Sequence, residues 1–228
     1  MQRTSSLLPA SLKPKFFEGL ESPEVREILD AGTLRKIPER EIVLVAGDTA
    51  SHLFLLASGH ANFYRFSQEG DRILLKGLTK GDIFGLGSLL SRRTHYMGTA
   101  ETTQDSDFVV WERARIRKLA ERHPRLAENA LEIVLQYLAA HADRLVDLVT
   151  LSAADRLARA IFHLSKQTGK IGPNGIEIQA TNEELSELAN VSSFTASRLL
   201  NKWIRRGALA KSRGKLFIHA PEELLVQK

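Results

Sequence analysis

The sequence of 228 residues contains no cysteine. This absence excludes disulfide bonds, thiolate zinc sites and cysteine-ligated iron–sulfur clusters, and it is compatible with a reducing compartment. No apolar run approaches the ~20 residues that cross a bilayer, and residues 1–11 lack the apolar core of a signal peptide. We therefore expect a cytoplasmic protein without a membrane partner.

The sequence also lacks the residue patterns that mark common enzymes. It has no Ser/His/Asp order, no cluster of metal ligands and no phosphate-binding glycine loop in a supporting context. Its 43% hydrophobic and 26% charged residues are ordinary for a globular protein. We expect a folded protein that is not an enzyme.

The positive charge is concentrated in the last third of the chain. Residues 1–150 carry as many basic as acidic side chains, whereas residues 151–228 carry 12 Lys and Arg against 7 Asp and Glu. Residues 191–215 contain seven of these cations and no acid. A surface of one sign attracts a polyanion, because each neutralised phosphate releases condensed counterions. An ordinary solvated basic face is the alternative.

The first half predicts a small β structure. Short apolar runs over residues 42–45, 52–56, 62–66 and 72–75 alternate with turn residues. The sequence Gln-Glu-Gly-Asp between the last two runs predicts a turn. We expect a β sandwich or roll over residues 34–111, with a short helix over residues 18–31 before it.

Residues 124–150 predict one long helix with an apolar seam. Pro124 suits the first turn of a helix, and neither Gly nor Pro follows it before residue 151. A seam repeating every seven residues is typical of a helix that pairs with its twin, although such a stripe can also pack on its own domain. We expect dimerisation through this helix. The seam consists of Leu131, Val134, Leu138, His141, Leu145 and Leu148.

A predicted hinge separates this helix from the next. Residues 152–155 interrupt the long helix, and a further helix follows over residues 156–166. Residues 169–175 are rich in turn formers, and a short strand follows over residues 176–178.

Two short helices joined by a tight turn come next. Thr181 and Glu184 match a capping box at the start of the first helix, and Asn190 tolerates the left-handed conformation that closes helices. Ser192 caps the second helix, over residues 193–206, which is apolar on one face and basic on the other. In a helix-turn-helix, the N-terminal residues of the second helix enter the major groove.

A basic hairpin is predicted after the second helix. Gly207 ends that helix, and residues 209–212 and 215–218 form two strands that turn at Arg213-Gly214. Such a wing can contact the phosphates that flank the groove.

This order of parts resembles the cyclic-AMP receptor protein / fumarate-nitrate regulator (Crp/Fnr) family of bacterial transcription regulators. The resemblance covers essentially the whole chain. It implies an α+β fold with a cyclic-nucleotide-binding-type β roll (1–123), a dimerisation helix (124–150) and a winged helix-turn-helix (151–228). It also implies a homodimer that binds a two-fold operator in double-stranded DNA and contacts RNA polymerase. The segments that carry it are Gly47-Asp48, Ser58-Gly59, Gly81-Asp82-Ile83-Phe84-Gly85, Thr181-Asn182-Glu183-Glu184-Leu185 and Val191-Ser192-Ser193-Phe194-Thr195-Ala196-Ser197-Arg198-Leu199-Leu200.

The resemblance assigns DNA contacts to matching positions. Arg198 would donate two hydrogen bonds to guanine. Ser192 and Thr195 would hold phosphates, and Ser193 and Ser197 would lie at the groove floor. The remaining DNA contacts are expected from Thr181, Asn182, Asn201, Lys202, Ser212 and Arg213.

Phe194 departs from the family pattern. Many members of the family have a glutamate at this position, whose carboxylate accepts a hydrogen bond from cytosine N4. A phenyl ring makes only apolar contacts, for example with a thymine methyl, so the preferred half-site should differ at this base pair. Packing of Phe194 against the wing is the alternative.

The cyclic-nucleotide site of the family requires a glutamate, an arginine and a serine. With Gly81–Gly85 as the reference, the glutamate position holds Leu86, and the arginine and serine positions fall near Thr94 and His95. These side chains do not compensate a phosphate charge, so we do not expect control by cyclic AMP. Arg92 and Arg93 would serve only in a differently built loop. An effector pocket would contain Leu86, Gly87, Ser88, Thr94, His95 and His141.

Alternatives for the effector and for the function remain. Haem is conceivable because His141 faces the expected pocket, although a lone seam histidine is more often a polar interhelical pair. The dimer could also need no small molecule. The alternative function is a ligand-binding or protein-interaction module whose winged helix no longer binds DNA, with Phe194 as an exposed anchor. DNA binding should weaken steeply with salt, which distinguishes the two functions.

Overall fold

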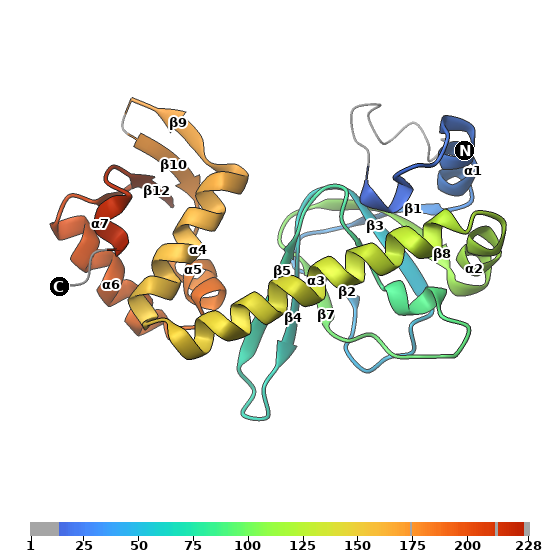
Figure 1. Ribbon diagram of the computed structural model, residues 1–228, viewed down its shortest axis with the longest axis horizontal. Helices are drawn as coiled ribbons and strands as arrows, with labels where there is room; N and C mark the ends of the chain where they lie inside the picture. The colour runs from blue at the N-terminus through green and yellow to red at the C-terminus, as the bar shows by residue number, and fades with distance from the viewer. Residues whose placement is uncertain (1–13, 174, 213, 226–228) are drawn as a thin grey trace. The chain divides into compact units, whose positions relative to one another are not determined.

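The computed structural model describes residues 14–173, 175–212 and 214–225. The chain forms two compact units, the first ending at Ala139 and the second beginning at Ala140, and the long helix α3 (Arg125–Thr150) contributes to both (Figure 1). The expected α+β class, with a β roll, a long helix and a winged helix-turn-helix, is confirmed. Within the described ranges, no helix has the length and apolar character that crossing a membrane requires.

Two four-stranded antiparallel sheets make up the roll of the N-terminal unit. One sheet has the strand order β1-β8-β3-β6, and the other has the order β2-β7-β4-β5. The strands are β1 (Thr33–Ile37), β2 (Ile42–Leu44), β3 (His52–Ser58), β4 (Ala61–Phe66), β5 (Arg72–Leu78), β6 (Ile83–Phe84), β7 (Thr99–Thr102) and β8 (Ser106–Glu112).

Strand β3 is buried on both faces, which explains why its sequence is a continuous apolar run. Successive side chains of a strand point to opposite sides. Phe54 and Leu56 pack between the two sheets, whereas Leu53 and Leu55 pack on the other side, against helices. The roll therefore has two layers of core that share this strand.

Helices cover the outer side of the first sheet. They are η2 (Lys15–Phe17), α1 (Ser22–Asp30), η3 (Leu86–Leu89), α2 (Arg113–Arg122) and the first turns of α3. The indole Nε1 of the fully buried Trp111 donates to the Ile28 carbonyl oxygen at 2.7 Å. Asn129 of α3 donates from Nδ2 to the carbonyl oxygens of Phe16 and Glu18. These bonds fix the N-terminal helices to β8 and to α3.

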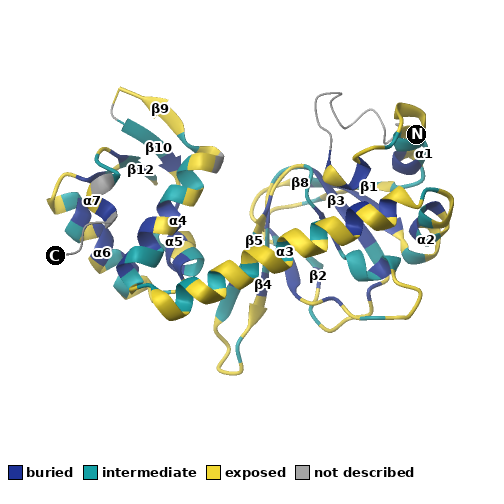
Figure 2. Cartoon of the chain, in the orientation of Figure 1, coloured by how far each residue is buried: buried dark blue, intermediate teal, exposed yellow. Residues whose placement is uncertain are grey.

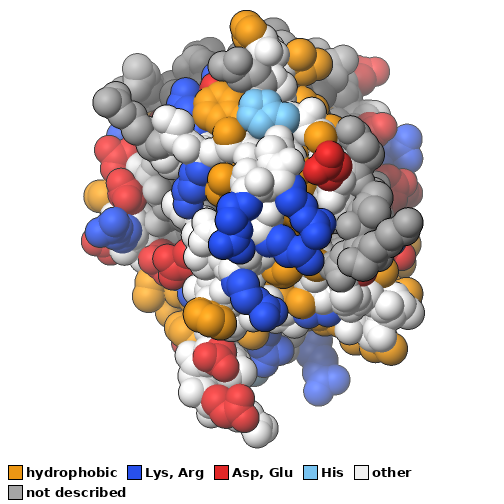
Figure 3. Space-filling view, turned by 90° about the vertical axis from the view of Figure 1, so that its left-hand side faces the viewer, with side chains coloured by type: hydrophobic (Ala, Val, Ile, Leu, Met, Phe, Trp, Pro, Cys, Tyr) orange, Lys and Arg blue, Asp and Glu red, His pale blue; other side chains and the backbone are white. Residues whose placement is uncertain are grey.

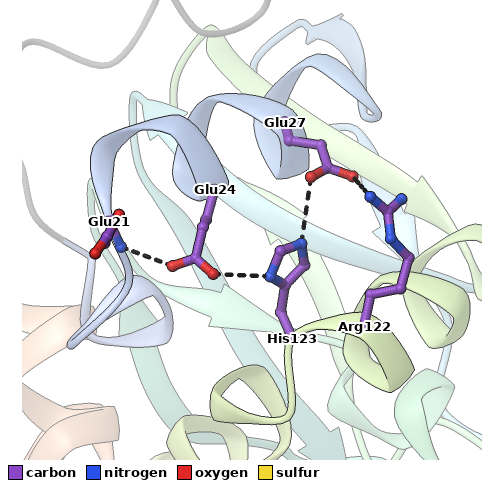
Figure 4. Close-up of polar contacts among 5 residues, drawn as sticks. All are labelled: Glu21, Glu24, Glu27, Arg122 and His123. Atoms are coloured by element: carbon purple, nitrogen blue, oxygen red, sulfur yellow. Dashed lines mark hydrogen bonds and ion pairs between the residues drawn. The ribbon is translucent and has the colours of Figure 1, made fainter.

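A cluster of polar contacts also joins α1 to the junction between α2 and α3 (Figure 4). His123 Nδ1 lies 3.1 Å from Glu24 Oε1, and His123 Nε2 lies 3.3 Å from Glu27 Oε2. Arg122 pairs with Glu27 at 2.7 Å. The hydrogen bond from the Glu21 amide is the main cause of a lowered pKa of the Glu24 carboxyl, and His123 lowers it further against the effect of burial.

The C-terminal unit packs helices on a four-stranded antiparallel sheet of order β11-β12-β10-β9. Leu157 and Ile161 share its core with Leu200 and Trp203. The helices are α4 (Ala153–Thr168), α5 (Asn182–Ala189), α6 (Ser193–Arg205) and α7 (Glu222–Leu225), and the strands are β9 (Lys170–Gly172), β10 (Gly175–Gln179), β11 (Leu209–Ser212) and β12 (Lys215–Ile218).

Several element boundaries differ from those expected. Helix α1 begins at Ser22 and not at residue 18, because Gly19 has a φ of 74° and a capping box between Glu21 and Glu24 starts the helix. Helix α4 begins at Ala153 and not at residue 156, because the Ser152 side chain caps it. Helix α2 was not expected, and β9 lies in the segment expected to be a turn, where it pairs with β10.

Gly59, between β3 and β4, should tolerate no side chain. Its φ is 94°, and an added Cβ would lie 2.1 Å from Ser106 Oγ and 2.7 Å from Ser106 Cα. We predict that Gly59→Ala lowers the free energy of unfolding by about 2–5 kcal/mol, because left-handed strain and overpacking add to each other. Urea-induced unfolding of the full chain measures this change.

Gly70→Ala is the matched control. Gly70 has a φ of 91°, but no atom lies within 4 Å of its added Cβ. Only the left-handed strain of about 1–2 kcal/mol is therefore expected. Equal losses in the two variants would contradict the close approach of Gly59 to Ser106.

Candidate nucleic-acid interface

Helix α5 begins and ends at the residues that the sequence predicts. The Thr181 hydroxyl accepts from the Glu184 amide at 3.1 Å, and the Glu184 carboxylate accepts from the Thr181 amide at 2.7 Å. At the other end, Asn190 has a φ of 49° and turns the chain in the left-handed conformation. The Val191 amide then donates to the Ser186 carbonyl oxygen at 3.0 Å. This closure leaves two residues between Asn190 and α6.

Helix α6 starts at an end that is rich in hydroxyl groups. Ser192 Oγ accepts from the Thr195 amide at 3.1 Å and lies 2.9 Å from Thr195 Oγ1. No acidic residue occupies the first turn, so no carboxylate of this turn offsets the positive end of the helix dipole. Such a helix end suits a phosphate oxygen.

Helix α6 has one buried and one open face. The buried face consists of Ala196, Leu199, Leu200 and Trp203. Phe194 is 78% exposed, so its side chain does not pack against the wing. The open face brings together six of the predicted site residues, of which Ser197 and Lys202 are half-buried and the others exposed: Ser193, Phe194, Ser197, Arg198, Asn201 and Lys202.

A hollow of about 380 Å³ adjoins this face. Arg198, Lys202 and Arg205 line it together with Ser152, which caps α4, and the first two residues of α4. Within the part of the chain that the structure describes, no carboxylate pairs with these three cations. Figure 3 looks onto the C-terminal unit and shows Lys and Arg side chains gathered in the middle of that face. The hollow therefore offers uncompensated positive charge beside the start of a helix.

Arg205 is a candidate that sequence analysis did not select. It follows Arg198 by seven residues, which is close to two turns of an α-helix. Helical periodicity was the signal that could have placed both arginines on one side of α6.

Two lysines among the described residues of the wing have polar partners. Lys215 pairs with Glu177 at 2.7 Å, and Lys211 Nζ donates to Asn182 Oδ1 at 2.7 Å. The predicted contact residue Asn182 is therefore already bonded to the wing. Ser212 is exposed on β11, and the predicted contact residue Arg213 lies outside the described residues.

The expected seam of α3 is largely exposed in the single chain (Figure 2). His141 is half-buried, and burial first, then the charge of Arg144, lowers the pKa of its imidazole. Leu148 is also half-buried, and the exposed seam residues are Leu131, Val134, Leu138 and Leu145. Leu135, Val146 and Val149 widen the exposed apolar surface beyond the expected seam.

The expected effector residues of the roll lie side by side but carry no charge suited to a phosphate. Leu86, Gly87 and Ser88 belong to η3, and Ser88 is fully buried. A Cβ added to Gly87 would lie 2.7 Å from Thr94 Cγ2, which places Thr94 and His95 beside this helix. His141 belongs to the second unit.

Two basic side chains of the N-terminal unit, Arg113 and Lys76, are bonded to other groups of the protein. Arg113 donates from Nη2 to two carbonyl oxygens of the loop after η3, at 2.7 and 2.9 Å. Lys76 pairs with Asp82 at 2.6 Å. Arg92 and Arg93 are exposed. The residues at the expected positions, Leu86, Thr94 and His95, supply neither the guanidinium nor the carboxylate that would hold the phosphate and the ribose of a cyclic nucleotide.

Comparison with known proteins matches both units to families. Residues 34–123 match the cyclic nucleotide-binding domain, and residues 155–226 match the Crp-like helix-turn-helix domain. The chain is 29% identical over 194 residues to the cyclic AMP receptor protein of Thermus thermophilus, covering 85% of this chain and 87% of that protein. It is 22% identical over 209 residues to the anaerobic regulatory protein of Bacillus subtilis, covering 90% of this chain and 88% of that protein.

Solved structures show the same fold. The c-di-GMP responsive global regulator CLP of Xanthomonas campestris superposes with a TM-score of 0.79 at 20% identity, covering 87% of this chain and 99% of that one. The catabolite activator protein of Thermus thermophilus superposes with a TM-score of 0.53 at 28% identity, covering 92% of this chain and 96% of that one. The chain thus belongs to the Crp/Fnr family of transcription regulators and carries the helix-turn-helix DNA-binding domain of that family.

Proposed function

We propose that the chain acts as a homodimer, binds a two-fold DNA operator through α6, and is not controlled by cyclic AMP. The observation that carries this proposal is the open face of α6, where Arg198, Lys202 and Arg205 have no acidic partner among the described residues. A surface of one sign beside a helix N-terminus favours binding to the phosphate backbone. A dimer would place its two α6 helices about 34 Å apart, one turn of DNA.

Arg198 and Phe194 are assigned to base recognition. Both are exposed on the N-terminal half of α6, the part of a recognition helix that enters the major groove. The Arg198 guanidinium can donate to guanine O6 and N7, which contributes about 1–3 kcal/mol of discrimination. The Phe194 ring can contact a thymine methyl where a glutamate of other members accepts from cytosine. The half-site should therefore differ from the usual family consensus at that base pair.

The polar residues around α6 are assigned to the phosphate backbone. Ser192 and Thr195 present hydroxyl groups at the helix start, and Lys202 and Arg205 supply charge along the hollow. Phosphate contacts fix the orientation of the helix but do not read sequence. The further proposed contacts are Thr181, Asn182, Ser193, Ser197, Asn201, Ser212 and Arg213.

The apolar seam of α3 supports the homodimer. Several leucines of one helix face water in the single chain, Leu138 with 63% of its surface. Contiguous apolar surface of this kind favours burial against a second copy, and a seven-residue repeat suits a parallel pair of helices.

The proposed independence from cyclic AMP rests on the residues around η3. Leu86 stands where the family's cyclic-nucleotide site has a carboxylate, and Thr94 and His95 stand where it has an arginine and a serine. A buried phosphate without a charge partner is strongly unfavourable. We propose that the dimer binds its operator without this ligand, and contact with RNA polymerase is part of the same proposal.

Arg198→Ala should remove sequence discrimination while leaving binding to DNA in place. Wild type should bind the operator about 5- to 150-fold more tightly than an operator in which the contacted guanine is replaced. This ratio is the equivalent of about 1–3 kcal/mol. The variant should show almost no preference. Fluorescence anisotropy at fixed salt measures both affinities. Arg206→Ala, at an exposed residue after α6, is the control and should keep the preference. Wild-type discrimination in Arg198→Ala would contradict the assignment.

Lys202→Ala and Arg205→Ala should weaken binding to all DNA sequences alike. Each change removes one phosphate contact, so the slope of log affinity against log salt should become shallower by about one. Lys215→Ala is the control and should change the slope less, because its ammonium pairs with Glu177. A wild-type affinity that does not depend on salt would favour the protein-interaction alternative.

Leu138→Glu should convert the dimer to a monomer. In the dimer the two carboxylates would face each other in an apolar seam, where burying unpaired charge is costly. Sedimentation equilibrium should give twice the chain mass of 25.4 kDa for wild type and the chain mass itself for the variant. Val146→Glu, an exposed position outside the seam, should remain dimeric. A dimeric Leu138→Glu would show that the interface lies elsewhere.

A further inference from the structure

The carboxyl-terminal end of α5 receives two arginines from other helices. Arg144 of α3 donates from Nη2 to the carbonyl oxygens of Glu187 and Leu188, at 3.0 and 3.4 Å. Arg156 of α4 donates to the next two carbonyl oxygens, at 3.0 and 3.3 Å. The last carbonyls of a helix lack intrahelical donors, and this end of the helix dipole favours cations. The end of α5 is therefore tied to α3 and to α4 at once.

Helices α3 and α4 are also linked across the turn that separates them. Arg159 Nη1 lies 2.5 Å from Asp147 Oδ1, and Arg156 donates from Nη1 to the Leu151 carbonyl oxygen at 2.9 Å. A bend at residues 152–155, where the sequence predicts a hinge, would strain these contacts and the contact of Arg144 with α5. The last turns of α3 are therefore fastened to the helix-turn-helix by side chains as well as by the chain itself.

The position of α5 determines the position of α6. Two residues separate Asn190 from α6, and Leu185 and Ala189 of α5 share a core with Ala196 and Leu200 of α6. Close-packed side chains transmit displacements instead of absorbing them. A shift of the end of α5 is therefore passed to the helix that carries the DNA contacts.

We propose that Arg144 is a positioning residue that fixes the direction of α6 relative to the last turns of α3. This inference rests on the proposed function, because a fixed direction matters where two recognition helices must meet one operator at a set spacing. Without the Arg144 guanidinium, the helix-turn-helix keeps its core and its contacts with Arg156. Helix α6 then samples a range of directions relative to the last turns of α3. The direction that fits the operator becomes a smaller fraction of the population.

Spin labels test this proposal without DNA. Because the chain has no cysteine, Val149→Cys on α3 and Arg206→Cys after α6, both exposed, give a defined pair of labels. An excess of unlabelled chain is added so that a dimer contains at most one labelled chain. The measured distance is then the one between the two labels of the same chain. Double electron–electron resonance should give one narrow distance distribution with Arg144 present and a broadened one in Arg144→Met, which keeps the aliphatic stem and removes the donors.

Two variants control this measurement. Arg125→Met removes an exposed arginine of α3, which pairs with Glu128 at 2.9 Å, and should leave the distribution narrow. Arg144→Lys keeps one charged donor and should give an intermediate width. If Arg144→Met does not fold, Arg144→Lys and Asp147→Asn take its place, each expected to broaden the distribution. An unchanged distribution in the folded variants would overturn the proposal.

Operator spacing gives a second, independent readout. Wild type should prefer one half-site spacing by at least about tenfold over spacings changed by one base pair, whereas Arg144→Met should prefer it by less than about threefold, with unchanged affinity for a single half-site. Equal weakening on every DNA, the half-site included, would indicate a merely structural role and overturn the proposal. A wild type without a preferred two-fold operator would contradict the proposed function, and the distance measurement would still decide the role of Arg144.

Discussion

Helix α5 ends at Asn190 in a left-handed conformation, and the carbonyl groups exposed there accept hydrogen bonds from Arg144 and Arg156. This helix end is where α3, α4 and the turn to α6 converge. Each cation at a helix carboxyl end contributes about 0.3–1 kcal/mol near a surface and more where the contact is partly buried. In the proposed account, the position of α6, and with it the DNA contacts assigned to α6, depends on these few carbonyl groups.

Selected basic side chains of the two units differ in their bonding partners. In the roll, Arg113 is bonded to loop carbonyls and Lys76 to a carboxylate. On α6, Arg198, Lys202 and Arg205 line one hollow with no carboxylate partner among the described residues. Like charges held together repel one another, and a phosphate relieves that repulsion. The face of α6 that should bind DNA therefore keeps positive charge that an anion would neutralise.

Local patterns predicted the elements near the site and failed where distant contacts decide. The capping box at Thr181, the turn at Asn190 and the cap at Ser192 depend on residues three or four positions apart, so the sequence alone specified them. The contact of Arg144 with α5 spans 43 positions, and nothing local indicates it. The pairing of β9 with β10 and the capped start of α1 are different: both depend on residues close in sequence, and the sequence analysis missed them.

The central claim is that the chain binds a two-fold operator through α6 and does not need cyclic AMP to do so. The most direct test is to select binding sites from random duplex DNA with the purified full chain and no added ligand. The account predicts recovery of a palindrome whose half-sites lie one turn of DNA apart, and no enriched sequence when Arg198 is replaced. Failure to enrich any sequence in low salt, or recovery of an asymmetric site, would contradict it.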